Sequence, residues 1–527
     1  MTPPWWADAV FYEIYVPSFC RGRPPSAGPG LAPAGGRMAG DLAGIRRRLD
    51  HLQWLGVDAL WLTPFYPSPM ADFGYDVADY CDVSPAFGTL DDFDRLLADA
   101  RDRGIRVIAD WVPNHTSDRH PWFVDARSSR QSPHREWYVW RDGSPDRPPN
   151  NWTAAFTRGP AWTWDEATGQ WYLHLFLPEQ PDLDWSNPAV EAAMHDVLRF
   201  WLDRGIDGFR VDVVHALGKD PALPDAPPDR AHLPWSSQND DPRTHPILRR
   251  LRALVDSYAG DRCLVGEVYL LSTTRVARYY GQGDELHMAF NFPPLYAPWT
   301  ADAWRHRIRR VEEEMGPIGA WPTWVLSNHD NARHRTRYGS EARARAAAVL
   351  LLGLRGTPFL YAGEELGLED AEVPADRVVD PGGRDGCRAP IPWEAGAGHG
   401  WEGADRTDVW LPWPPDPDRR NAAYLRSDPG SILHLYRRLL AARRASPALR
   451  RGGYEELDAP EGVLAFRRVA ADRPGDDRVV LVNFGDSDVG CAAPWPATVV
   501  VDSRGEGEGG PYAGVLGASA AVVLAPG

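Results

Sequence analysis

The sequence has little of three features that define common protein classes: lysine, cysteine and long apolar runs. Lys219 is its only lysine, and 73 acidic residues outnumber 57 basic ones, which gives a formal net charge of −16. Because nucleic-acid binding depends on clustered cations that displace counterions, we expect no nucleic-acid partner. No stretch approaches the roughly 20 apolar residues of a membrane-spanning helix, so we expect no membrane partner either.

The five cysteines are scattered without the close spacing of a metal or disulfide motif. We therefore expect neither a zinc site nor a disulfide framework, and no cofactor. The chain runs from Met1 almost directly into a strand-like segment, residues 11–16, which leaves no room for a signal peptide. On this basis we expect a cytoplasmic protein, either a monomer or a homo-oligomer.

Tryptophan, by contrast, is abundant, with 24 in the chain. Flat rings in polar loops suit the faces of sugars, although any single Trp more often packs a loop onto its scaffold. The candidates in polar connecting segments are Trp137, Trp140, Trp152, Trp162, Trp164, Trp171 and Trp185.

Short apolar runs alternate with amphipathic helical segments through the first two-thirds of the chain, which is typical of parallel strands joined by helices. One such helix is expected at residues 90–104. The eight strand-like runs are residues 11–16, 57–63, 106–112, 208–214, 263–269, 287–292, 323–329 and 358–361. The sequence therefore predicts an α/β fold, an eight-stranded (β/α) TIM barrel.

Two regions depart from the alternation. About 70 residues rich in Trp, Pro and Asn follow the third strand, which is too long for a loop and predicts a small inserted domain. From about residue 452, short alternating strands with Gly, Asp and Pro in the turns predict a C-terminal antiparallel β-sandwich domain. The expected limits are 1–112 for the first part of the barrel, 113–186 for the inserted domain, 187–451 for the second part of the barrel and 452–527 for the C-terminal domain.

The active site of such a barrel lies at the carboxyl ends of its strands, and several of these ends are acidic. Asp212, Glu267 and Asp330 should converge there. A single acid at a strand end is more often a salt-bridge partner, but three clustered carboxylates repel one another and favour a catalytic use. Breaking a glycosidic bond with retention needs two carboxyl groups about 5–5.5 Å apart, one of them protonated.

Ordered motifs run along most of the chain. They are Gly40-Asp41-Leu42, residues 68–76, the strand-end motifs at 110–115, 208–212, 266–268 and 327–331, the segment 180–185 and Cys387-Arg388-Ala389-Pro390. Together they resemble the α-amylase superfamily, glycoside hydrolase family 13, and particularly its α-glucosidase and oligo-1,6-glucosidase branch.

This resemblance implies roles for the strand-end residues. Asp212 would be the nucleophile, Glu267 the general acid and then base, and Asp330 the acid that grips the sugar hydroxyls. Arg210 lies on the same face of its strand as Asp212 and should keep that carboxylate ionised, whereas Glu267 has no comparable basic neighbour in its strand and could hold a proton. His115 and His329 resemble the family's donors to glucose hydroxyls.

Three more residues resemble those that close the pocket behind the terminal sugar. Tyr75 would stack on the ring, and an Asp72/Arg388 pair would meet its far hydroxyl and impose exo action; the alternative is an ordinary interdomain salt bridge. Relatives often bind a divalent cation in the loop after the first strand, but here residues 21–39 contain no acid and three arginines. We therefore expect no metal.

The sequence thus predicts a retaining, exo-acting α-glucosidase that hydrolyses short α-glucosides such as maltose and malto-oligosaccharides, with isomaltose as a further candidate. A transglucosylase or a trehalose-synthase-type isomerase would use the same acids, and a non-catalytic binding protein is a third reading. The linkage stays open, because Val213 resembles the α-1,6 branch while residues 214–217 depart from it.

Overall fold

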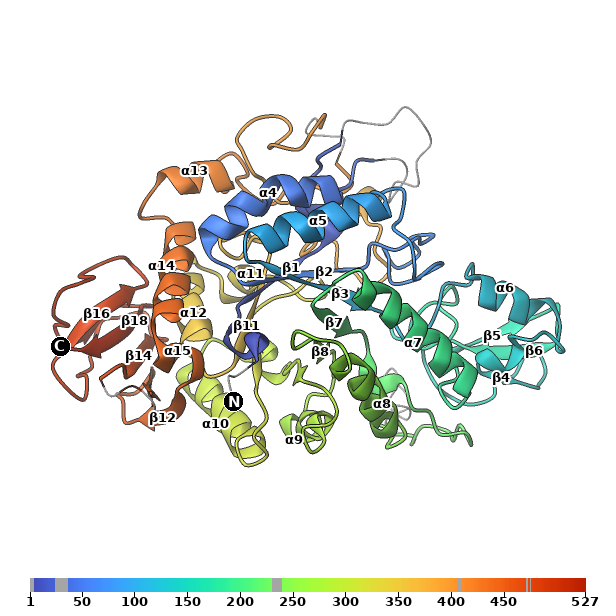
Figure 1. The fold of residues 1–527 in the computed structure, drawn as a ribbon. Coiled ribbons are helices and arrows are strands. Elements are labelled where there is room, and N and C mark those ends of the chain that lie inside the picture. The colour runs from blue at the N-terminus through green and yellow to red at the C-terminus, as the bar shows by residue number, and fades with distance from the viewer. Residues whose placement is uncertain (1–3, 24–36, 230–238, 405–408, 471–472, 474) are drawn as a thin grey trace.

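The computed structural model describes residues 4–23, 37–229, 239–404, 409–470, 473 and 475–527. Its largest sheet has eight parallel strands in the order β10-β11-β1-β2-β3-β7-β8-β9 and forms a nearly closed barrel in the middle of the molecule (Figure 1). The strands are β1 (Phe11–Ile14), β2 (Ala59–Leu62), β3 (Arg106–Trp111), β7 (Gly208–Val211), β8 (Cys263–Gly266), β9 (Met288–Ala289), β10 (Thr323–Val325) and β11 (Thr357–Tyr361). The eight predicted strands and the predicted barrel are confirmed.

The interior of the barrel changes from apolar to charged within two residues along a strand. Alternate residues of a strand point to the same face, and Phe11 of β1 and Ile108 of β3 belong to one buried apolar cluster inside the barrel. Two positions further on, the same strands carry Glu13 and Asp110, which are also buried. The charged layer lies towards the carboxyl ends of the strands, where the active site of a barrel is expected.

The helices around the barrel begin and end at local sequence signals. The side chain of Asp41 caps α4 (Leu42–Leu55), and Thr89 and Asp92 form a reciprocal capping box at α5 (Leu90–Asp102), the helix predicted at 90–104. The other barrel helices are α7 (Pro188–Asp203), α8 (Thr244–Asp256), α9 (Thr273–Ala277), α10 (Ala301–Met315), α12 (Glu341–Gly353) and α14 (Ile432–Ala445). Within the described ranges, none of the helices is long and apolar enough to cross a membrane.

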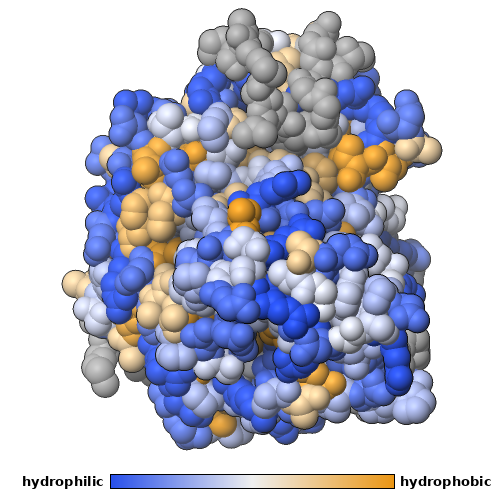
Figure 2. All heavy atoms as spheres, turned by 90° about the vertical axis from the view of Figure 1, so that its right-hand side faces the viewer, coloured by the Kyte–Doolittle hydropathy of each residue, from blue (hydrophilic) through white to orange (hydrophobic). Residues whose placement is uncertain are grey.

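The segment inserted after β3 forms a small unit with its own sheet, at the right of Figure 1. Three antiparallel strands lie in the order β4 (Trp140–Arg141), β6 (Gln170–Leu173) and β5 (Trp162–Asp165), beside α6 (Pro121–Ser128). The exterior on this side is mostly hydrophilic, with hydrophobic residues in small separate groups (Figure 2).

The tryptophans of this segment pack into its hydrophobic core. Trp152 and Trp162 are almost fully buried, and their cluster includes Val213 and Ala216 of the barrel. None of the seven tryptophans considered as sugar platforms lines the pocket described below. The packing role, which is the more common one for a Trp in a loop, therefore applies here.

The C-terminal segment is an antiparallel sheet, as predicted, covered on one face by a short ribbon. Its strand order is β12 (Gly453–Leu457), β13 (Val463–Val469), β14 (Arg478–Asn483), β18 (Ala521–Pro526) and β16 (Ala497–Asp502), and the ribbon pairs β15 (Val489–Gly490) with β17 (Val515–Leu516). The other face packs on α12 of the barrel. The exact limits of the four segments stay a prediction.

A buried arginine joins this sheet to the barrel. Arg468 on β13 has no exposed surface, and it donates to the carbonyl oxygens of Gly353, Leu449 and Gly452 at 2.7, 3.1 and 2.8 Å. Gly353 is the last residue of α12, where the partial negative charge of the helix favours a cation. One guanidinium thus satisfies carbonyl groups on both sides of the contact.

We expect Arg468→Met to lower the free energy of unfolding by about 2–4 kcal/mol, because the buried carbonyl groups lose their donor. Arg467→Met is the matched control: Arg467 is a neighbour on the same strand, a third exposed and paired with Asp477, and its loss should cost less than about 1 kcal/mol. Urea unfolding measures both values. Equal losses in the two variants would show that Arg468 does not hold the contact together.

Candidate active site

A pocket of about 260 Å³ opens at the carboxyl ends of the barrel strands. Six of the nine predicted site residues line it: Asp72, Tyr75, His115, Asp212, Glu267 and Asp330. The other three, Arg210, His329 and Arg388, are buried next to these residues. The cavity is slightly smaller than the 300–1,000 Å³ of typical ligand pockets, so it suits a small ligand.

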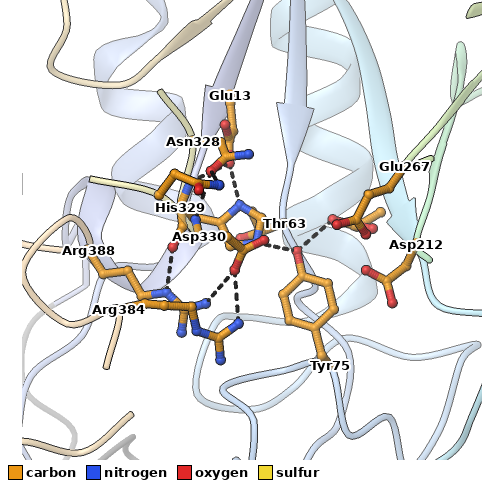
Figure 3. A network of polar contacts seen from close by, with 12 residues as sticks. Glu13, Thr63, Tyr75, Asp212, Glu267, Asn328, His329, Asp330, Arg384 and Arg388 are labelled. Carbon is orange, nitrogen blue, oxygen red and sulfur yellow. Dashed lines mark hydrogen bonds and ion pairs between the residues drawn. The ribbon is translucent and has the colours of Figure 1, made fainter. Parts of the chain in front are cut away.

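The three predicted acids do meet in this pocket (Figure 3). Asp212 directly follows β7 and Glu267 directly follows β8, and these two strands are neighbours in the barrel. Asp330 comes from the loop after β10, on the opposite side of the mouth in Figure 3.

One guanidinium binds two of these acids and a third carboxylate. Arg210 donates to Asp110 at 2.6 Å, to Asp212 at 2.7 Å and to Glu267 at 2.7 Å. The sequence analysis found no basic neighbour for Glu267 in its own strand, and the arginine that binds Glu267 comes from the adjacent strand. It considered only the residues of one strand, whereas the register of β7 with β8 places Arg210 beside Val265, two positions before Glu267.

One cation cannot neutralise three carboxylates, so the cluster favours retaining a proton. Burial raises the pKa of Asp212 well above its ordinary value, and the nearby carboxylates of Glu267 and Asp110 add to the rise, while Arg210 opposes it. Protonation of any one carboxyl lowers the repulsion felt by the others. In the free site, burial and the two neighbouring carboxylates thus favour a proton on Asp212, which goes against the expectation that Arg210 keeps this carboxylate ionised.

The residue after Asp212 has an uncommon backbone conformation that completes this arrangement. Val213 is left-handed, with φ of 35°, which is costly for a β-branched side chain. Its N–H donates to Glu267 at 3.0 Å, and its side chain lies in the apolar cluster of the inserted segment. Packing by that segment therefore helps to hold Glu267 in place.

Asp330 is held as a carboxylate on the opposite side. Arg384 and Arg388 donate to its Oδ1 at 2.9 and 3.1 Å, and His329 Nε2 lies 3.3 Å from its Oδ2. Burial alone would raise the pKa of Asp330, but the charges of the two guanidinium groups lower it below its ordinary value. An ionised Asp330 is a strong acceptor for sugar hydroxyl groups.

The predicted Asp72/Arg388 pair does not form. Asp72 binds Arg384 at 2.6 Å and accepts from the amide of Gln180 at 3.0 Å, whereas Arg388 binds Asp380 and the His329 carbonyl behind the pocket. Arg384 also lies over the ring of Phe156 from the inserted segment, 4.5 Å from its centre. Sequence reasoning chose the wrong one of two arginines four positions apart, and nothing in the spacing distinguishes them.

The remaining predicted residues form the side walls. Tyr75 lines the pocket and stacks parallel to His329, with ring centres 5.5 Å apart, and its hydroxyl donates to Asp110 at 2.9 Å. Burial lowers the pKa of His115 to about 3, so this ring is neutral at physiological pH. Phe156, Phe176, Tyr269 and Asn331 also line the pocket, and the sequence analysis did not single them out.

The comparisons with known proteins agree with this architecture. The family described as "Alpha amylase, catalytic domain" matches residues 13–452. The chain therefore belongs to the α-amylase superfamily, glycoside hydrolase family 13, and is a glycoside hydrolase.

Individual relatives cover nearly the whole chain. A "Probable alpha-glucosidase" of Rhizobium meliloti (strain 1021) is 41% identical over 88% of this chain and 87% of its own length. An "Oligo-1,6-glucosidase" of Parageobacillus thermoglucosidasius is 33% identical over 92% and 91%. The solved structure of XgtA, an "alpha-glucosyl transfer enzyme", is 38% identical, covers 100% of both chains and has a TM-score of 0.89.

The single lysine of the chain ties the inserted segment to the barrel. Lys219 Nζ lies 3.0 Å from Asn114 Oδ1, 3.1 Å from the Ala216 carbonyl oxygen and 3.1 Å from a carboxylate oxygen of Asp182. Asp182 belongs to the inserted segment and is fully buried. The ammonium group is thus surrounded by oxygen atoms from both units.

The loop for which we predicted no metal is only partly described, since residues 24–36 lie outside the described ranges. Asp41, the acid next to that loop, accepts from the N–H groups of Gly22 and Gly44 at 2.9 and 2.7 Å and pairs with Arg23. Its carboxylate is therefore engaged by this chain's own donors. No cluster of three or more His, Cys, Asp or Glu side chains suited to a metal ion occurs among the described residues.

We expect Lys219→Met to lower the free energy of unfolding by about 3–5 kcal/mol, because it leaves Asp182 as an unpaired buried charge. The loss should grow as the pH rises, since burial raises the pKa of an unpaired Asp182 and the buried acid is tolerated only while protonated. Denaturant unfolding at pH 5 and pH 8 measures both effects.

The control is the double variant Lys219→Met/Asp182→Asn, which removes the charge as well as its partner. It should recover most of the stability lost in the single variant. A single variant as stable as the wild type at pH 8 would contradict the role of Lys219 as the link between the two units.

Proposed function

We propose that this chain is a retaining, exo-acting α-glucosidase that releases glucose from short α-glucosides, namely maltose and malto-oligosaccharides, with isomaltose as a further candidate. The observation that carries the proposal is the shared guanidinium of Arg210, which holds Asp212 and Glu267 side by side at a pocket for one sugar ring. Retention requires two carboxyl groups at close range, and one guanidinium can bind both only when they are close.

In the proposed reaction Asp212 attacks the anomeric carbon while Glu267 protonates the departing oxygen. Arg210 and the Val213 N–H both bind Oε2 of Glu267, so we assign the proton of the cluster to Oε1 of Glu267 in the substrate complex, which leaves Asp212 ionised for its attack. The glucosyl ester of Asp212 is then hydrolysed by a water molecule from which Glu267, now a carboxylate, takes a proton. Asp330 binds sugar hydroxyls and stabilises the positive charge that develops on the ring.

Exo action follows from the closed end of the pocket. The Asp72–Arg384 ion pair and the Phe156 ring over Arg384 form a wall behind the position of the terminal glucose. A polysaccharide chain cannot pass such a wall, so only the terminal unit reaches Asp212. The identities to an α-glucosidase and an oligo-1,6-glucosidase support this substrate class and leave the linkage preference to the assay.

A second candidate is glucosyl transfer to an acceptor other than water, including a trehalose-synthase-type isomerisation. The 38% identity to an α-glucosyl transfer enzyme over the full chain favours it. The same acids form the same ester, and only the acceptor differs. The complete set of acids argues against a non-catalytic binding protein, and the five free cysteines support a cytoplasmic location.

Proton NMR of maltose and isomaltose hydrolysis tests the proposed function. We expect glucose as the main product. From an aryl α-glucoside, whose leaving group is not a sugar, the glucose should appear first as the α anomer because two displacements retain the configuration. Trehalose or longer sugars as main products would favour the transfer reaction. First release of the β anomer from the aryl α-glucoside would show inversion and contradict the ester on Asp212.

We expect Arg384→Ala to lower kcat/KM on maltose by one to three orders of magnitude, about 1.4–4 kcal/mol, because Asp72 is left unpaired and Asp330 loses a partner. The wild type should barely reduce the viscosity of soluble starch, whose internal bonds do not fit a closed pocket. Rapid loss of viscosity with the wild type, or an Arg384→Ala variant equal to the wild type on maltose, would contradict the exo assignment.

A further inference from the structure

A buried carboxyl group behind the pocket has no part in the reaction described so far. Glu13 lies on β1 in the centre of the barrel, with 1% of its surface exposed. Every other carboxylate named at the site either lines the pocket or binds an arginine side chain. A buried ionised carboxylate without a cation is costly, so its partner and its protonation state require an explanation.

The partner of Glu13 is His329 (Figure 3). Glu13 Oε1 lies 2.5 Å from His329 Nδ1 and also accepts from the backbone N–H of His329 at 3.2 Å. The imidazole is itself buried, with 1% exposed. A contact of this length between Oε1 and Nδ1 requires one hydrogen atom between the two.

The hydrogen atoms on the other side of the ring can be counted. The Tyr75 hydroxyl oxygen lies 2.8 Å from His329 Nε2 and 2.9 Å from Asp110 Oδ2, and a phenol has one hydrogen to donate. Burial raises the pKa of Asp110 to about 6, so near neutral pH it is a carboxylate that binds Arg210 and only accepts, and Tyr75 therefore donates to Asp110. His329 Nε2 must then carry a hydrogen and donate to Tyr75.

We propose that Glu13 is a positioning residue: as a neutral carboxylic acid it donates its proton to His329 Nδ1 and thereby holds the imidazole in the Nε2–H tautomer. Both groups of the pair are then uncharged, which is the least costly way to bury them. Burial raises the pKa of Glu13 well above its ordinary value and lowers the pKa of His329, and both directions favour this distribution of the proton.

The consequence reaches the pocket through His329. Its Nε2–H lies between the Tyr75 oxygen and Asp330 Oδ2, 3.3 Å away, so the tautomer orients one wall of the pocket and the acid that binds the sugar hydroxyls. Glu13 does not line the pocket and acts only through His329. This positioning role rests on the proposed glucosidase reaction. The assignment of the His329 tautomer does not depend on that reaction.

Long-range 1H–15N NMR of enzyme labelled with 15N-histidine tests the tautomer without reference to activity. The His329 signals are those that disappear in His329→Asn. We expect a protonated Nε2 and a bare Nδ1 near neutral pH. A protonated Nδ1 with a bare Nε2, or protonation of both nitrogens as in an imidazolium–carboxylate pair, would overturn the proposal even if the enzyme proves to have another substrate.

Two variants test the positioning role with an aryl α-glucoside. The amide N–H of Glu13→Gln can donate to Nδ1 as the acid does, so kcat should stay within about threefold of the wild type, whereas Glu13→Leu has no donor and should lose more than about tenfold in kcat with a smaller change in KM. The same NMR experiment should show the Nε2–H tautomer in the Gln variant.

Glu365 provides the matched control, because it is a fully buried carboxyl group bound by Tyr12 at 2.8 Å and does not line the pocket. Glu365→Gln and Glu365→Leu should lower the Tm and leave kcat of the folded enzyme unchanged. A Glu13→Leu variant that loses only Tm, or a Glu13→Gln variant as slow as Glu13→Leu, would overturn the proposal. A wild type inactive on every α-glucoside would instead contradict the proposed function, and the NMR result would still decide the tautomer.

Discussion

The structure of the site depends on one buried guanidinium. Arg210 is anchored in β7, where its backbone neighbours are Asp110 on β3 and Val265 on β8, and its side chain binds three carboxylates that would otherwise repel one another. Without a cation at this point, burying Asp110, Asp212 and Glu267 together would be prohibitive. Because one positive charge faces three acids, the cluster favours keeping a proton, and the proposed division of roles between an acid and a nucleophile uses that proton.

The inserted segment contributes to the same site although it supplies none of the three predicted catalytic acids. Its apolar cluster packs against Val213, whose left-handed backbone directs an N–H to Glu267, and its Phe156 ring packs against Arg384 in the wall of the pocket. Lys219 of the barrel links the two units, because its ammonium group contacts Asn114 and Asp182 of the inserted segment. The positions of Glu267 and Arg384, and with them the proposed acid and the proposed wall of the pocket, therefore depend on how firmly this segment is docked.

Much of the fold could be predicted because buried parallel strands can be recognised in a sequence as short apolar runs between amphipathic helices. The carboxyl ends of such strands meet at one end of the barrel. For that reason the sequence alone predicted that Asp212, Glu267 and Asp330 lie close together. The same logic could have found Glu13, since it alternates with Phe11 on the inward face of β1. The sequence analysis considered only residues at the ends of strands, and Glu13 lies within one.

Contacts between side chains from different strands and loops could not be predicted in this way. Arg210 binds Glu267 as well as Asp212 because of the register between two strands. Arg384 rather than Arg388 reaches Asp72, and Arg388 instead binds the His329 carbonyl behind the pocket. Both facts depend on three-dimensional placement that neither spacing nor residue type determines. The tryptophans are a similar case, since burial decides between packing and binding.

Mass spectrometry of the enzyme after reaction with 5-fluoro-α-glucosyl fluoride tests the assignment of Asp212 most directly. The fluorine on the ring disfavours the positively charged transition state, so the covalent intermediate of a retaining enzyme accumulates. We expect one fluoroglucosyl group on the peptide that contains Asp212, and none in an Asp212→Asn variant. Turnover of the reagent without any adduct, or an adduct on Glu267 or Asp330, would contradict the mechanism.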